Sequence, residues 1–201
     1  MAAAWRPTVG AGLARTLGRM KTITLLATVS ALLCGEACAQ SSQASPAARL
    51  AEMINTYRGE LGLPAVPLSP ALTKVAEAHA HDLEKSVRGQ QCNMHSWSSA
   101  GEWTPCCYTN DHARAQCMWA KPRELTRGAY AGNGYEIAHG GGGRVTPESA
   151  LRGWRGSQGH HEVIINKGIW STSRWQAMGV AITDHYALVW FGEVADSSNR
   201  P

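Results

Sequence analysis

The chain has 201 residues and a formal net charge of +4, with 19 Lys and Arg residues against 15 Asp and Glu residues. Residues 1–39 contain four of the basic residues and one acidic residue, so residues 40–201 carry 15 basic against 14 acidic side chains. A charge this close to balance argues against a nucleic-acid partner, which needs a basic surface. The remaining length, roughly 160 residues, is typical of one domain.

The N-terminus has the pattern of an export signal. A nearly continuous apolar run over residues 22–34 follows several basic residues, and Ala37-Cys38-Ala39 fits the small-x-small rule for cleavage after Ala39. Met20 starts such a signal better than Met1 does. The run is too short for a transmembrane helix. The sequence therefore predicts a signal peptide over 1–39, no transmembrane segment, and a secreted or periplasmic protein.

Four cysteines remain beyond the signal: Cys92, Cys106, Cys107 and Cys117. An even number in an exported chain predicts two disulfides, for which three connectivities exist. A bridge between the adjacent Cys106 and Cys107 would be strained, which favours pairing each of them with Cys92 or Cys117. A zinc knuckle is the alternative, although the adjacent pair lacks the C-x2-C spacing of such sites. Either way, the cysteines would staple a single loop.

Two helices are predicted in the first half of the domain, after a flexible Ser- and Gln-rich leader over 40–46. Ser45-Pro46 and Ser69-Pro70 each place an N-cap serine before a proline in the first turn. Apolar residues follow both signals at helical spacing. Gly62 and Pro64 end the first helix.

The second half begins with an irregular stretch over 86–135, which is too long for an ordinary connection and predicts a stapled functional loop. Thr146-Pro147-Glu148 then predicts the start of a third helix, and residues 160–166 a short fourth one. Two strands over 178–183 and 186–193 are predicted as a final hairpin. Helices followed by a hairpin indicate an α+β domain.

Three separated side chains are the candidates for chemistry: His95, Glu136 and His160. Two imidazoles and a carboxylate suit a small cation site or an acid/base pocket. The alternative is a buried hydrogen-bonded network that holds loops together. His79, on the inward face of the second helix, is predicted to be a core histidine.

Seven segments, in this order, resemble the CAP superfamily of cysteine-rich secretory proteins, antigen 5 and pathogenesis-related proteins. They are Ile54-Asn55-Thr56-Tyr57-Arg58, Leu72 through Asp82, His95-Ser96-Trp97, Gly134 through Ala138, Trp154 through His160, Met178-Gly179-Val180-Ala181 and Trp190-Phe191-Gly192. The resemblance implies a three-layer α-β-α sandwich with a long disulfide-stapled loop. We expect it to form a single domain over 47–195, followed by a loose tail over 196–201.

The resemblance also implies a central cleft in which two histidines and two acids can hold a divalent cation. His95, Glu136 and His160 match three of these positions, and the fourth is Ser157 here. Three ligands resemble an open zinc site with water in the fourth place. Ser157 is also a conceivable nucleophile beside His160, but an N-cap role for it is the stronger expectation.

The function implied by the resemblance is that of a non-enzymatic binding module for a small apolar, lipid- or sterol-like, or envelope ligand. Trp103 and Trp119, in an insert over 98–132, are expected at the rim of the cleft. The alternative is a metal-assisted hydrolase in which Glu136 is a ligand or general base. A third hypothesis is a protein partner that binds the loop over 98–122.

Overall fold

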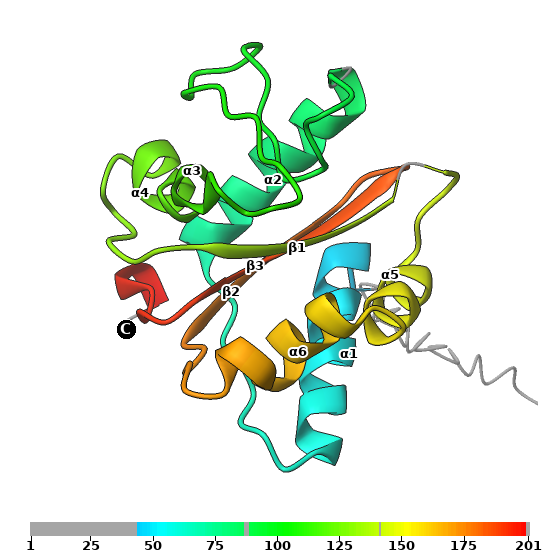
Figure 1. The fold of residues 1–201 in the computed structure, drawn as a ribbon. Coiled ribbons are helices and arrows are strands. Elements are labelled where there is room, and N and C mark those ends of the chain that lie inside the picture. The colour runs from blue at the N-terminus through cyan, green and yellow to red at the C-terminus, as the bar shows by residue number, and fades with distance from the viewer. Residues whose placement is uncertain (1–43, 87–88, 141, 200–201) are drawn as a thin grey trace, which may run out of the picture. The chain divides into compact units, whose positions relative to one another are not determined.

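The computed structural model describes residues 44–86, 89–140 and 142–199. The predicted signal peptide over 1–39, its cleavage site and most of the leader lie outside these residues. The described chain places one antiparallel sheet between two groups of helices (Figure 1). The predicted α+β three-layer sandwich is therefore confirmed.

The sheet has three strands: β1 (Tyr135–Gly140), β2 (Ala177–Ile182) and β3 (Tyr186–Gly192). Their spatial order is β1-β3-β2, and both neighbouring pairs are antiparallel. The hairpin of β2 and β3 is the one that the sequence predicts. No pattern predicts β1, because Glu136 and His139 interrupt its apolar run, yet β1 forms the edge of the sheet at which the candidate residues meet.

The sheet separates two apolar cores because successive side chains of a strand point to opposite faces. In β3, Val189 and Phe191 belong to one core, whereas Leu188 and Trp190 belong to the other. All four are 0% exposed. β3 therefore reads as a continuous apolar run, as expected of a central strand covered on both faces.

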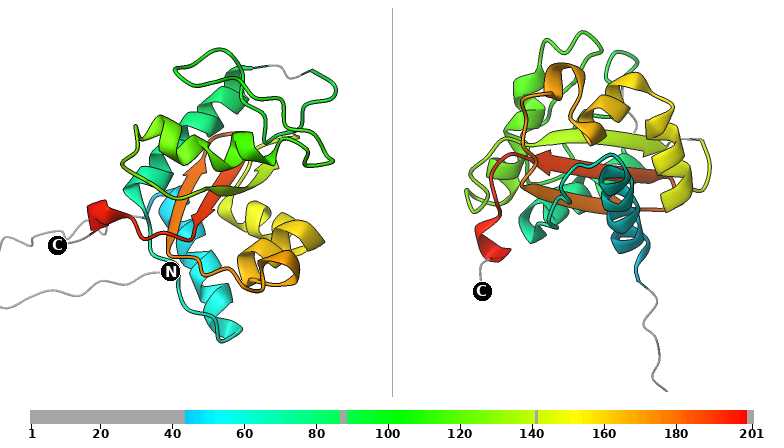
Figure 2. Two further views of the ribbon diagram at one scale, coloured as in Figure 1. Left: turned by 60° about the vertical axis from the view of Figure 1, so that its left-hand side comes forward. Right: turned by 90° about the horizontal axis from the view of Figure 1, so that it is seen from below.

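One face of the sheet is covered by α1 (Pro46–Glu60), α5 (Pro147–Arg155) and α6 (Gln158–Ile165), and the views of Figure 2 agree on this placement. Two of these helices begin as predicted. Ser45 and Thr146 each accept a hydrogen bond from the amide three residues further on, at 3.2 and 3.1 Å. α6 begins earlier than the sequence predicts, since glycine at its second position does not interrupt it.

The opposite face is covered by α2 (Pro70–Lys85), with α3 (Ala115–Trp119) and α4 (Lys121–Leu125) beside it. α2 lies directly on the sheet at Gly179, where a Cβ atom would come within 2.3 Å of the backbone of Leu72. Glycine at this position is what allows the close approach. None of the helices in the described part of the chain is both long and apolar enough to cross a membrane.

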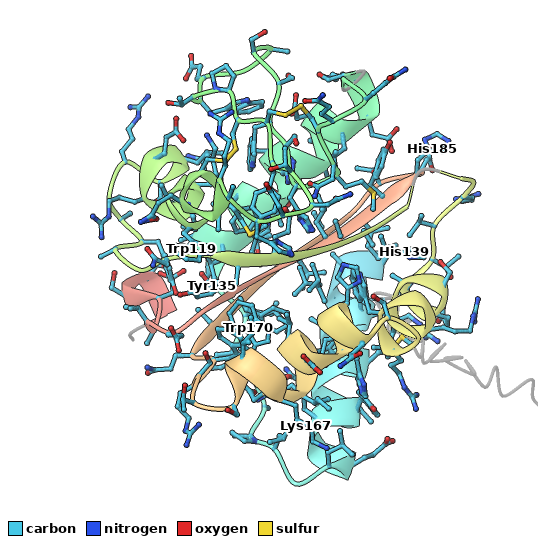
Figure 3. The ribbon with its side chains drawn as sticks, viewed as in Figure 1. Trp119, Tyr135, His139, Lys167, Trp170 and His185 are labelled. Carbon is cyan, nitrogen blue, oxygen red and sulfur yellow. A yellow bond between two sulfur atoms is a disulfide. The ribbon has the colours of Figure 1, made fainter. Side chains whose placement is uncertain are left out.

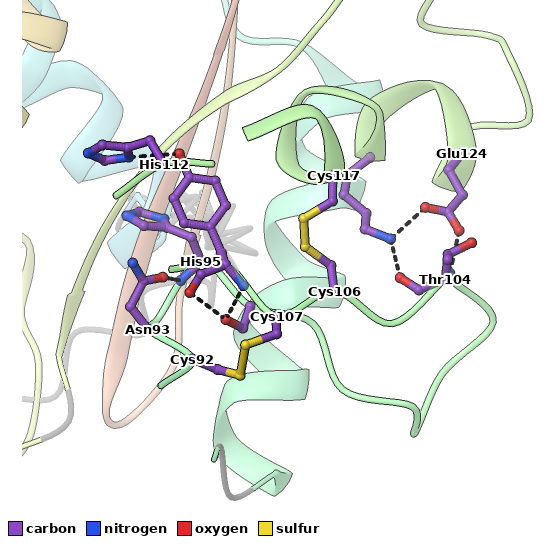
Figure 4. The surroundings of a disulfide bond; sticks show 12 residues. Cys92, Asn93, His95, Thr104, Cys106, Cys107, His112, Cys117 and Glu124 are labelled. Atoms are coloured by element: carbon purple, nitrogen blue, oxygen red, sulfur yellow. Dashed lines mark hydrogen bonds and ion pairs between the residues drawn. A yellow bond between two sulfur atoms is a disulfide. The ribbon is translucent and has the colours of Figure 1, made fainter. Parts of the chain in front are cut away.

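Two disulfides hold the irregular stretch before β1 (Figure 4). Cys92 is bonded to Cys107, and Cys106 to Cys117. The prediction that Cys106 and Cys107 pair with Cys92 and Cys117, and not with each other, is thereby confirmed. The second bridge joins the segment around Cys106, which pairs with Trp97 through two backbone hydrogen bonds, to α3. The stretch is thus less irregular than predicted, since it contains both α3 and α4.

The predicted loose tail is anchored at its first residue. Asp196 is 5% exposed, and its carboxylate accepts hydrogen bonds from the Ser69 hydroxyl at 2.5 Å and from the Ala71 amide at 3.0 Å. These partners lie at the N-terminus of α2, which favours a negative charge. The expectation of a loose tail from Asp196 is therefore wrong at that residue, because polar composition alone does not reveal a buried cap.

Candidate functional site

A cavity of about 520 Å³ lies along the outer edge of β1. Because β1 is an edge strand, the two helical layers extend past it, and residues from both layers form the walls. One wall comes from the stapled loop and α3, and the other from α6 and the 3₁₀ turn η1 (Gly168–Trp170). The described lining residues are His95, Tyr108, His112, Ala115, Met118, Trp119, Tyr135, Glu136, Ile137, Ser157, Gly159, His160, Glu162, Val163, Ile169 and Trp170.

The carboxylate of Glu136 is the centre of the polar part of this cavity. Its side chain is 0% exposed, with Oε1 lying 2.7 Å from Nδ1 of His79 and Oε2 lying 3.1 Å from Nδ1 of His95. His79 also donates from Nε2 to the backbone carbonyl of Ser96 at 3.0 Å. The ring of Trp97 stacks on His79, with centroids 4.1 Å apart. This chain of contacts therefore runs from α2 through β1 to the loop.

The network determines which form of Glu136 and His95 the cavity presents. Burial, the largest single influence, raises the pKa of Glu136, but the charge and hydrogen bond of His79 and the hydrogen bond of His95 outweigh it and lower the pKa. An ionised carboxylate only accepts hydrogen bonds, so Nδ1 of His95 carries a hydrogen. Nε2, the other ring nitrogen of His95, makes no hydrogen bond to any residue that the structure describes.

His160 reaches the same cavity from the first turn of α6. Its Nδ1 lies 2.9 Å from the hydroxyl of Ser157, and its ring is partly buried. Burial, the largest influence, and then the charges of His95 and His139 lower the pKa of His160, so the ring is neutral at neutral pH. Ser157 occupies the N-cap position, as expected, but its side chain makes no capping hydrogen bond to the described helix. Its hydroxyl contacts His160 instead.

The three predicted cation ligands thus line one cavity but do not form a ligand set. Each oxygen of Glu136 contacts an imidazole, and Nδ1 of His160 lies against the hydroxyl of Ser157. Zinc sites in proteins use three or four protein ligands. Within the described residues, no three His, Cys, Asp or Glu side chains are grouped to hold a metal ion. The predicted cation site stays a prediction.

The opposite end of the cavity is aromatic (Figure 3). Trp119, Tyr135 and Trp170 lie at the beginning of β1, away from His139 at its end. Their rings meet edge to face, with centroids 6.1 Å apart between Trp119 and Tyr135 and 5.0 Å apart between Tyr135 and Trp170. Trp119 is therefore at the cavity, as expected. Trp103 is not among the lining residues, because it packs against Trp97 and donates to the Ser98 carbonyl.

The roles of four residues in the site were not predicted from the sequence. His79 is a core histidine, as predicted, but it also fixes Glu136, and only the contact across layers reveals this. Tyr108 and His112 bond to each other at 3.0 Å in the cavity wall, where His112 is exposed in a turn. Nothing in the sequence distinguishes Trp170 from the other tryptophans as a lining residue of the cavity.

Three solved structures resemble this chain. An extracellular protein containing an SCP domain from Bacillus anthracis is 17% identical with a TM-score of 0.50, over 74% of this chain and 40% of that one. An outer surface protein from Borrelia burgdorferi is 18% identical with a TM-score of 0.47, over 72% of this chain and 90% of that one. A cysteine-rich secretory protein from Staphylococcus aureus is 16% identical with a TM-score of 0.46, over 73% and 37%.

The likeness to the Bacillus protein supports the fold alone, and this chain spans well under half of that protein's length. No curated protein matches the chain. The model of the cysteine-rich secretory protein family, CAP, matches residues 51–187, which is more than half of the chain and includes His95, Glu136 and His160. By this match and by its three-layer fold, the chain belongs to the CAP family.

Proposed function

We propose that this CAP domain is an exported, non-enzymatic binding module for a small amphiphilic ligand of the lipid or envelope class. The N-terminal apolar run and the two disulfides support export. The observation that carries the binding role is the cavity along β1. Its volume of about 520 Å³ is in the range of small-molecule sites.

The lining of this cavity favours a ligand with an apolar part. Aromatic and aliphatic side chains make up most of it: Ala115, Met118, Trp119, Tyr135, Ile137, Val163, Ile169 and Trp170. Apolar groups gain free energy when they leave water for such a surface.

The polar groups present support binding better than catalysis. A general base needs a free acceptor within reach of the substrate proton. The Glu136 side chain is 0% exposed, and its two oxygens face the imidazoles of His79 and His95 rather than open space. The carboxylate therefore serves to orient His95.

Titration with N-phenyl-1-naphthylamine, a neutral apolar fluorophore, tests this proposal. We expect saturable one-to-one binding to the chain from Gln40 with its disulfides intact. Ala115→Phe, which fills the cavity from α3, should abolish it, whereas Ala113→Phe at an exposed site nearby should not. Absence of saturable binding, or equal binding by both variants, would contradict the proposal.

A cation-assisted hydrolase is the second candidate, and one observation favours it. A carboxylate that holds the Nδ1 hydrogen of a histidine, as Glu136 holds that of His95, is typical of metal-ligating histidines. Zinc titration of the wild type and of a His95→Ala/His160→Ala double variant tests this. Stoichiometric zinc binding that depends on the two histidines would support the hydrolase candidate, and absence of zinc binding would rule it out.

A further inference from the structure

The outer edge of β1 is one of the two edges of the sheet, and it forms the floor of the cavity. β1 pairs with β3 on its inner side only, and Tyr135, Glu136 and Ile137 line the cavity. In an antiparallel pair, the backbone groups of alternate residues point toward the partner strand, and those of the residues between them point away from it. The side of β1 that faces the cavity therefore carries the backbone N–H and C=O groups of every second residue.

A contact with α3 shows which residues of β1 point outward. The amide of Glu136 donates to Sδ of Met118 at 3.4 Å, so it is directed away from β3. α3 covers the start of this edge, since the Gly134 amide likewise donates to the carbonyl of Trp119 at 3.1 Å. Because the outward positions alternate, Ala138 is the next residue after Glu136 whose N–H and C=O point away from β3.

The opposite edge of the sheet indicates the same alternation independently. In β2, the amide and the carbonyl of Met178 bond to the segment before α2, at 2.8 Å in both cases, so Met178 points away from β3. Its partner in β3, Phe191, therefore bonds to β1, where it lies opposite Tyr135. Since Tyr135 bonds to β3, its neighbour Glu136 points outward, in agreement with the contact to α3.

Two of the outward groups, the C=O of Glu136 and the N–H of Ala138, make no hydrogen bond to any residue that the structure describes. They lie on either side of Ile137, which lines the cavity. Glu136, Ile137 and Ala138 are only 6%, 1% and 2% exposed, so the two groups are largely removed from bulk water. Buried backbone groups are almost always paired, because an unpaired one costs free energy. An occupant of the cavity that bonds to both groups would recover this free energy.

The direction and spacing of the two groups fit one amino acid residue in an extended conformation. In a parallel pair, a residue donates its N–H to the carbonyl before the residue opposite it, and its C=O accepts from the amide after that residue. A residue that lies beside Ile137 in this way pairs with Glu136 and Ala138 together. Because it runs in the direction of β1, the group on its nitrogen points back to the beginning of the strand, where the cavity is aromatic (Figure 3).

From these features we infer that the cavity binds amphiphiles in which a fatty acyl chain is joined by an amide bond to an amino acid residue. The open edge of β1 binds the amide and the carbonyl of that residue, and Trp119, Tyr135 and Trp170 provide the apolar surface for the chain. An ester-linked lipid has no N–H at this position and leaves the carbonyl of Glu136 unpaired. The inference rests on the proposed binding function, whose ligand class it narrows to N-acyl amino acids.

Displacement of bound N-phenyl-1-naphthylamine from the wild-type protein by two matched probes tests the inference. One probe is N-lauroyl-L-alanine methylamide. The other is O-lauroyl-L-lactic acid methylamide, an ester analogue in which oxygen replaces the acyl N–H, and each is used below its critical micelle concentration. We expect the amide to bind about fivefold more tightly, the effect of one hydrogen bond. Equal binding, or tighter binding of the ester, would overturn the inference.

A third probe, N-acetyl-L-alanine methylamide, has the same amide and the same residue but lacks the long chain. We expect it to bind at least about tenfold more weakly than the lauroyl amide, because it leaves the aromatic end of the cavity unfilled. Equal binding of the acetyl and lauroyl amides would contradict the placement of the chain among the aromatic rings.

Ala138→Pro removes the backbone donor without altering the ladder to β3. Proline is accepted in edge strands where its nitrogen faces away from the neighbouring strand. We expect the lauroyl amide to lose about fivefold in affinity, with the fluorophore unchanged because it has no carbonyl to accept from this amide. Ala131→Pro, at an exposed site before β1 and outside the cavity, is the matched control and should change neither affinity. Wild-type affinity for the lauroyl amide in folded Ala138→Pro would refute the role of the edge.

The two proposals fail in different ways. If the neutral fluorophore does not bind at all, the binding function itself is wrong. If the fluorophore binds and Ala115→Phe blocks it, but the amide and the ester displace it equally, only the pairing with β1 is wrong. Circular dichroism and thermal unfolding show whether each variant is folded. The comparison of the amide with the ester uses the wild type alone, so it decides the inference even if Ala138→Pro does not fold.

Discussion

Replacement of Asp196 by Asn tests how the end of the chain is coupled to the helix beneath the candidate site. Asp196 follows β3, and Oδ2 accepts from the Ser69 hydroxyl and the Ala71 amide at the N-terminus of α2. Oδ1 accepts from the amide and hydroxyl of Ser198, at 2.9 and 2.7 Å. Asn keeps the shape of the side chain but loses the charge and turns one acceptor into a donor.

The contribution of the Asp196 charge to the free energy of unfolding follows from the pKa of Asp196. Burial is the largest influence and raises the pKa, but the hydrogen bonds from Ser69, Ser198 and Ala71 lower it from its ordinary 3.8 to about 2. A shift of roughly two units corresponds to about 2 kcal/mol of stability. Because the folded pKa is depressed, this stability is fully present above about pH 4. It is lost as the pH falls through about 2.

Urea unfolding followed by tryptophan fluorescence at a series of pH values checks this. At neutral pH we expect Asp196→Asn to lower the free energy of unfolding by about 2 kcal/mol, and the gap to the wild type to close between pH 4 and pH 2. Asp184→Asn, at an exposed turn, is the control and should change little. A gap that stays constant across this pH range would refute the assignment of the effect to the charge of Asp196.

Three further changes test other parts of the structure by the same unfolding assay. Glu136→Gln should cost about 3 kcal/mol or more at neutral pH, because it leaves two imidazoles without their buried anion; an unchanged midpoint would contradict the network. Gly179→Ala should cost at least about 2 kcal/mol, since its methyl group meets α2 backbone, whereas Gly59→Ala, with no atom within 4 Å, should stabilise slightly. Replacing Cys106 and Cys117 together by Ser should cost about 3 kcal/mol and weaken fluorophore binding, because the bridge holds α3 at the cavity; unaltered binding would show that α3 is held by packing alone.

Local signals in the sequence were sufficient for most of the helices and for the hairpin. Ser45, Ser69 and Thr146 each cap the helix that they were expected to cap, because an N-cap hydrogen bond joins residues only three apart. The apolar run over 186–193 predicted a strand, and the structure shows that the side chains of β3 alternate between two cores. The outward pairing of Cys106 and Cys107 followed from their adjacency alone.

The candidate site was predicted in part. The family resemblance identified His95, Glu136 and His160, and the structure brings all three to one cavity. It did not indicate that Glu136 is fully engaged by two imidazoles. The sequence also missed β1, because a strand that carries a buried carboxylate lacks the apolar alternation by which strands are recognised.

What the sequence alone determined is therefore four of the helices, the final hairpin, the outward pairing of the adjacent cysteines and the residues that could do chemistry. Only the tertiary structure decided how those residues are used. His79 and Glu136 are 57 residues apart, and their hydrogen bond exists because α2 packs on one face of the sheet, mainly on β2 and β3. The role of Glu136 as the group that orients His95 depends on such contacts between distant segments, which no local pattern encodes.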